Sequence, residues 1–69
     1  MDGEYHWTIE VFCSDEAAFD LLELIGERWY RTDDEDLRAK VEVLGTEAEC
    51  RRVQARIERS PFVTDAILE

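Results

Sequence analysis

The sequence predicts a small α+β domain whose elements follow the order strand, helix, strand, strand, helix, strand. Two stretches, Tyr5–Cys13 and residues 37–44, alternate apolar with polar side chains, as half-buried strands do. Each of them is followed by a segment whose apolar residues recur at helical spacing. A chain of 69 residues provides one small core, so residues 1–69 are expected to form a single domain.

The first half of the chain is predicted to form a strand, a helix and a short second strand. Ser14 follows the strand Tyr5–Cys13 and is a suitable N-cap for the helix. The predicted buried stripe of this helix consists of Ala18, Leu21, Leu22 and Ile25. Gly26 suits the left-handed residue at the helix end. Residues 28–32 are predicted to be a strand; the alternative merges them into the helix or a loop and leaves three strands.

The second half repeats this pattern after a turn at residues 33–36. The strand at residues 37–44 ends at Gly45, and Thr46 with Glu49 forms a capping box that opens the second helix. This helix is predicted to bury Cys50, Val53 and Ile57. Ser60-Pro61 ends the helix because a residue before proline avoids the helical region, and residues 62–68 form the last strand.

Two consecutive β-α-β halves of this kind predict a ferredoxin-like domain. Right-handed crossovers then place both helices on one face of an antiparallel four-stranded sheet. The core between sheet and helices is predicted to contain Trp7, Ile9, Val11, Leu21, Leu22, Ile25, Val41, Val43, Val53 and Ile57.

Two short segments resemble those of the small ACT-type regulatory modules. They are Gly45-Thr46-Glu47, at the start of the second helix, and Ser60-Pro61-Phe62-Val63, which leads into the terminal strand. The resemblance extends as a pattern over most of the chain, and it implies a ferredoxin-like fold with a regulatory or dimerising role. The glycine-rich ligand turn that such modules carry after the first strand is replaced here by Cys13-Ser14-Asp15-Glu16.

The chain is strongly acidic and its carboxylates are concentrated in two places. Eighteen Asp and Glu residues face eight Lys and Arg residues, which gives a net charge of −10. The first predicted helix carries an acidic face formed by Glu16, Asp20, Glu23 and Glu27. The turn carries a run formed by Asp33, Asp34, Glu35 and Asp36. Because such like charges repel and destabilise a helix, they indicate either a cationic partner or a saline environment.

We expect these eight carboxylates to form a surface that binds a partner. Carboxylates pair with the same Arg and Lys groups that bind phosphates. The expected function is therefore a non-enzymatic inhibitor that presents carboxylates to a basic, nucleic-acid-binding protein surface, as small phage and mobile-element proteins of the anti-CRISPR kind do. The alternative is a small ACT-like regulatory or dimerisation module that is acidic through salt adaptation. Dimerisation or binding of a partner is also expected, with a homodimer as one possibility, because so small a core provides only about 3–5 kcal/mol.

The sequence predicts no catalytic residue, cofactor or metal site. His6 is the single histidine and falls on the predicted solvent face of the first strand. Cys13 and Cys50 lack the Cys-x-x-Cys spacing of metal and redox sites and are expected to be free thiols. No glycine-rich phosphate loop is present, and the acidic run lacks the alternating spacing of a calcium loop.

Direct binding to nucleic acid or membrane is not expected. A charge of −10 repels phosphates, and the strand at residues 37–44 exposes Arg38, Lys40 and Glu42 where RNA-binding sheets carry aromatic residues. The second helix carries an arginine face formed by Arg52, Arg56 and Arg59, which is interpreted as balancing acids on neighbouring elements or in a dimer. No apolar run approaches the ~20 residues of a membrane span, and the acidic N-terminus does not resemble a signal peptide, so a cytoplasmic location is expected.

Overall fold

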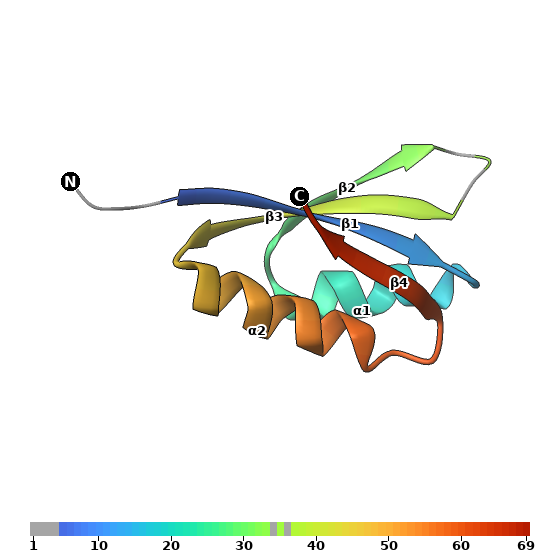
Figure 1. Cartoon of the computed structure of the whole chain (residues 1–69). Coiled ribbons are helices and arrows are strands. Elements are labelled where there is room, and N and C mark those ends of the chain that lie inside the picture. The colour runs from blue at the N-terminus through green and yellow to red at the C-terminus, as the bar shows by residue number, and fades with distance from the viewer. Residues whose placement is uncertain (1–4, 34, 36) are drawn as a thin grey trace.

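The computed structural model describes residues 5–33, 35 and 37–69 of the chain (Figure 1). Its elements are β1 (Tyr5–Cys13), α1 (Ala17–Ile25), β2 (Arg28–Asp33), β3 (Arg38–Gly45), α2 (Glu47–Glu58) and β4 (Val63–Leu68). This order and a single open sheet confirm the predicted ferredoxin-like α+β fold. Because β2 pairs with β3 in that sheet, the alternative with three strands is wrong.

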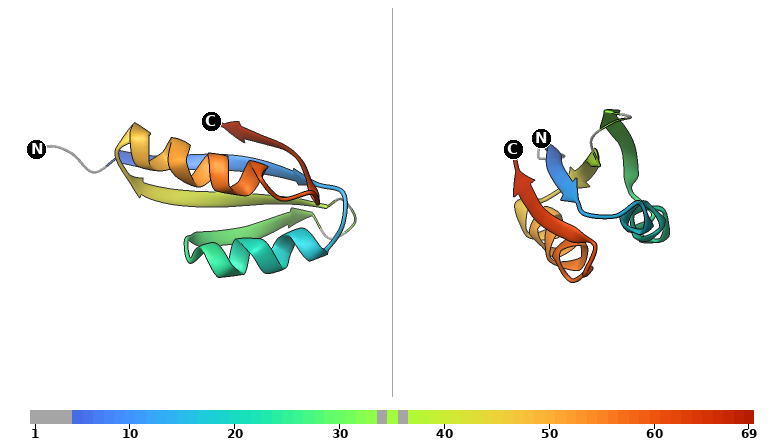
Figure 2. Two further views of the ribbon diagram at one scale, coloured as in Figure 1. Left: turned by 90° about the horizontal axis from the view of Figure 1, so that it is seen from below. Right: turned by 90° about the vertical axis from the view of Figure 1, so that its right-hand side faces the viewer.

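The four strands lie in the order β2-β3-β1-β4, and each neighbouring pair is antiparallel. Val41 in β3 is the partner of both Ile9 in β1 and Trp29 in β2, so these three side chains share one face of the sheet. Both helices cover this face: α1 lies next to β2, and α2 lies across β1 and β4 (Figure 2). The two helices run in opposite directions (Figure 2).

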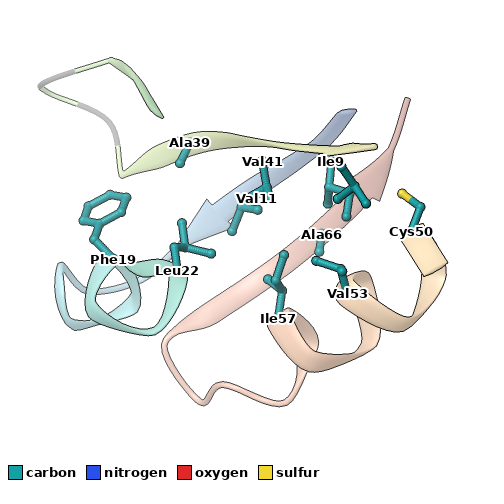
Figure 3. Close-up of a cluster of buried hydrophobic side chains, with 11 residues drawn as sticks. Ile9, Val11, Phe19, Leu22, Ala39, Val41, Cys50, Val53, Ile57 and Ala66 are labelled. Carbon is teal, nitrogen blue, oxygen red and sulfur yellow. The ribbon is translucent and has the colours of Figure 1, made fainter. Parts of the chain in front are cut away.

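The core lies between this face of the sheet and the helices (Figure 3). Its buried apolar residues are Ile9, Val11, Ala18, Phe19, Leu22, Ala39, Val41, Val43, Cys50, Val53, Ile57 and Ala66. Burial of Val41 and Val43 confirms the predicted register of β3. Within the predicted core set, Trp7, Leu21 and Ile25 are instead only half-buried.

Helix α1 begins differently from the prediction. Its N-cap residue is Glu16, not Ser14, and Glu16 makes no side-chain capping bond. The first turn is held by Asp15, whose Oδ1 accepts a hydrogen bond of 2.8 Å from the Ala17 backbone N–H. Ser14 lies outside the helix, where both its N–H and its Oγ donate to the Phe62 carbonyl, at 2.8 and 3.2 Å. These bonds join the start of α1 to the segment that leads from α2 into β4.

The other helix boundaries follow local chemistry. Gly26 ends α1 in the left-handed region at φ +86°, as predicted. The predicted capping box opens α2: Thr46 Oγ1 accepts from the Glu49 N–H and the Glu49 carboxylate accepts from the Thr46 N–H, at 3.2 and 3.3 Å. Helix α2 buries Cys50, Val53 and Ile57, also as predicted.

Candidate functional site

Three carboxylates lie on the exposed side of α1 and are called here the acidic row: Glu16, Asp20 and Glu23. Among the described residues, no group forms an ion pair or a hydrogen bond with the side chains of Glu16 and Asp20. Glu23 accepts a hydrogen bond of 3.2 Å from Trp29 Nε1. The acidic row therefore lies on the exposed side of α1, and no cation among the described residues pairs with it.

The fourth residue of the predicted acidic face does not belong to the helix. Because α1 ends at Ile25 and Gly26 turns the chain into β2, Glu27 lies beyond the helix and is half-buried. Its side chain lines a hollow with His6, Arg28 and Glu42. Helical spacing cannot place Glu27 beside Glu23 once the left-handed glycine has intervened, so the prediction of a four-residue row is wrong at this position.

The acidic turn between β2 and β3 is described only in part. Asp33 is the last residue of β2, not the first residue of the turn, and Glu35 is exposed in the turn. Asp34 and Asp36 lie outside the described residues. The Cys13 N–H donates to the Leu37 carbonyl at 2.8 Å, which places the end of the turn beside the end of β1. The turn and the start of α1 are thus at the same end of the domain.

The exposed side of α2 carries a row of arginines beside the exposed Glu47, Glu49 and Glu58. Arg52, Arg56 and Arg59, called here the arginine row, are exposed, and no described carboxylate pairs with them. Elsewhere in the described chain Arg51 pairs with Glu47 at 2.8 Å, and Lys40 pairs with Glu69 at 3.6 Å. The predicted balancing of the arginine row by acids of neighbouring elements is therefore not seen within the described chain.

An apolar groove separates the two helices. This interhelical groove is lined by Ala17, Leu21, Leu24, Arg56, Arg59, Ser60, Pro61 and Phe62. Leu24 is 79% exposed and Phe62 is 41% exposed. Sequence reasoning missed this feature because it assigned Leu21 to the buried stripe and gave Leu24 no role. The signal was present in the spacing of Ala17, Leu21 and Leu24, which share a face of α1 adjacent to the core stripe.

The hollow that Glu27 lines has a volume of about 420 Å³ and lies on the face of the sheet opposite the helices. It is called here the far hollow, and its lining residues are His6, Glu27, Arg28, Glu42 and Leu44. His6 Nε2 lies 3.4 Å from Glu42 Oε1. The described residues that line this hollow include no hydroxyl or thiol group that His6 could activate as a nucleophile. Within the described part of the chain, no three His, Cys, Asp or Glu side chains are grouped to hold a metal ion.

Both cysteines are free thiols, Cys50 buried and Cys13 half-buried. Burial raises the pKa of Cys50. Nearby Arg51 lowers this pKa by a smaller amount, and Glu47 raises it further. Burial also raises the pKa of the half-buried Cys13, while nearby Arg31 lowers it. Because the thiolate is the reactive form, raised pKa values keep both groups protonated at neutral pH.

The fold and these surfaces define a ferredoxin-like α+β domain that exposes the acidic row on α1 and the arginine row on α2. No known protein family, curated protein or solved structure matches the chain. In the described residues no helix combines the length and the apolar character that a bilayer crossing requires.

Proposed function

We propose that this protein is a non-enzymatic inhibitor that binds a basic, nucleic-acid-binding surface of another protein through the acidic row and the neighbouring turn. The observation that carries the proposal is that Glu16 and Asp20 are exposed at the start of α1 and that no cationic group among the described residues pairs with either of them. Exposed carboxylates of this kind are accessible from solvent, so they can pair with Arg and Lys groups of a partner.

The spacing of the carboxylates supports recognition of a phosphate-binding surface. Glu16 and Asp20 lie one helical turn apart, which is about 6 Å along the helix at 1.5 Å per residue. Two neighbouring cationic groups of a partner, of the kind that bind phosphates, can therefore each pair with one of these carboxylates. The exposed Glu35 at the same end of the domain extends this acidic surface.

The free thiols fit a reducing compartment, so we place this interaction in the cytoplasm. The proposal assigns no cofactor, metal or catalytic residue. It treats the arginine row as separate from the surface that meets the basic partner.

The experiment compares two variants that change the net charge equally. Asp20→Lys lies in the acidic row, whereas Glu58→Lys is exposed on α2 and serves as the matched control. Immobilised wild-type protein is used to purify partners from the native host, which mass spectrometry identifies. Each purified partner is then tested for displacement of a fluorescent DNA or RNA by the wild type and by both variants.

The proposal expects displacement of the nucleic acid by the wild type and by Glu58→Lys, with a loss of at least about tenfold in affinity for Asp20→Lys. Higher salt should weaken the interaction steeply, because the charges involved are exposed. Equal displacement by Asp20→Lys and the wild type would refute the role of the acidic row. A captured partner that binds no nucleic acid would refute the proposed function as an inhibitor of nucleic-acid binding.

A regulatory or dimerisation module is the second candidate, and one specific observation favours it. The interhelical groove exposes Leu24 and Phe62 beside an arginine row that has no ion pair in the described chain. Self-association, together with a failure to displace nucleic acid from any captured partner, would favour this candidate over the first.

A further inference from the structure

We propose that the interhelical groove binds a second copy of this chain and forms a two-fold symmetric dimer in which α1 of each copy packs on α2 of the other. The proposal does not rest on the proposed function. It concerns the groove and the charge on either side of it, and its test measures self-association without any other partner.

The groove exposes large apolar side chains on both of its sides. On the α1 side of the groove Leu24 is 79% exposed, and on the α2 side Phe62 is 41% exposed. Leu21, half-buried between them, forms part of the floor. A second copy that covers these side chains removes their apolar surface from water, which contributes about 25 cal/mol for each Å² buried.

Charge identifies the occupant as another copy of the chain. The acidic row is Glu16, Asp20 and Glu23, and the arginine row is Arg52, Arg56 and Arg59. In both rows the first and the last of the three charges are seven positions apart, which is about 10 Å of helix at 1.5 Å per residue. Each row thus has the length and the charge needed to complement the other, and neither row finds an ionic partner within the described chain.

The same charges select the symmetry. A face-to-face dimer has its two-fold axis in the plane of the interface. An axis that runs along the groove places α1 opposite α2 of the other copy, and these helices are then antiparallel because α1 and α2 are antiparallel within one chain (Figure 2). An axis across the groove places α1 opposite α1, so the acidic rows would repel each other. Only the axis along the groove gives attraction on both sides.

The position of the helices along the groove sets which charges meet. The Ser14 N–H donates to the Phe62 carbonyl, so the start of α1 lies at the same end of the groove as the end of α2. Rotation about an axis along the groove preserves this position. Glu16 therefore faces Arg59 of the other copy, and Asp20 faces Arg56 of the other copy. The dimer contains each of these pairs twice.

Sedimentation velocity over about 10 µM to 1 mM tests the dimer, with circular dichroism to verify folding. Leu24→Asp should raise the dimer dissociation constant at least about tenfold, because it places a charge in the covered groove. Leu44→Asp is the matched control: Leu44 is 66% exposed but lies in β3 at the far hollow, so its substitution should leave the dimer intact. A wild type that remains monomeric, or a Leu24→Asp variant that still dimerises, would overturn the proposal.

Charge reversal tests the symmetry. The pair Glu16→Arg and Asp20→Arg should abolish the dimer, as should the pair Arg56→Glu and Arg59→Glu. All four changes together should restore it, because each reversed helix again meets an opposite charge. With an axis across the groove, the fourfold variant would still place like charges together and stay monomeric. If the reversed variants fail to fold, a wild-type dimer that does not weaken between about 0.05 and 0.5 M salt refutes the charge pairing.

The dimer and the proposed basic partner use the same carboxylates, but one variant distinguishes failure of one proposal from failure of the other. Leu24→Asp removes the dimer while the acidic row stays intact. This variant should keep or increase its displacement of nucleic acid from a partner, since the carboxylates are no longer covered. Loss of self-association without loss of partner binding thus separates the two proposals.

Discussion

The aromatic ring of Phe19 stacks on that of Trp29, with ring centroids 5.7 Å apart and planes 3° from parallel. Phe19 lies in α1, and Trp29 lies on the helix-covered face of β2. The guanidinium carbon of Arg31 lies 4.4 Å from the centre of the same Phe19 ring. These contacts attach helix α1 to the edge strand β2.

The first prediction concerns this attachment. Phe19→Leu should lower the free energy of unfolding by about 1–2 kcal/mol, because leucine retains apolar volume but loses the stacked geometry. Urea titration followed by tryptophan fluorescence measures the change. The control is Leu24→Ala, an exposed position on the same helix, which should change stability by no more than about 0.5 kcal/mol in the monomer. Equal effects of the two substitutions would contradict a structural role of the stacked pair.

The second prediction tests the register of β3. Val41 is buried at the centre of the sheet, so Val41→Ala should cost about 1–3 kcal/mol through lost burial and a residual cavity. Leu44 lies in the same strand with its side chain exposed, and Leu44→Ala should be nearly neutral. Chemical denaturation of both variants gives the comparison. A larger loss for Leu44→Ala would indicate that the strand presents its other face to the helices.

The third prediction concerns pH. Burial raises the pKa of Cys50 above its ordinary value of 9.0, so the unfolded chain releases this proton at a lower pH than the folded chain. The contribution of Cys50 to stability is therefore complete below the unfolded pKa and declines as pH rises from about 9 through the folded pKa. Urea midpoints measured between neutral and alkaline pH should fall less steeply for Cys50→Ala than for the wild type. Identical slopes would argue against burial of the thiol.

The fourth prediction concerns salt. A net charge of −10 places the folded domain under repulsion, and screening relieves it. The thermal midpoint should therefore rise between about 0.02 M and 1 M sodium chloride. Asp20→Lys, which removes repulsion within α1, should be less sensitive to salt than the wild type. A chain that is unfolded at about 0.15 M salt would support salt adaptation over binding of a basic partner.

The sequence by itself determined the faces of β1 and β3 and the start of α2, while the pairing of β2 with β3 was needed to establish the fourth strand. Side chains alternate between the two faces of any strand, so the pattern of residues 5–13 places Ile9 and Val11 together whatever their neighbours are. The capping box of Thr46 and Glu49 joins groups three residues apart, and it can be recognised without knowledge of the rest of the chain. The acidic face could also be predicted as far as the helix extends, which includes Glu16, Asp20 and Glu23.

Only the tertiary structure decided how α1 is rotated and what surrounds it. Helical spacing allows either Phe19 or Leu21 to enter the core, and β2 selects Phe19 by offering Trp29 as a stacking partner. Leu21 and Leu24 consequently line a groove opposite Arg56, a residue far away in the sequence. Ser14 likewise donates to the Phe62 carbonyl and is not the N-cap of α1. Each of these outcomes depends on contacts between separate elements, and local spacing contains no information about which surface a neighbouring element presents.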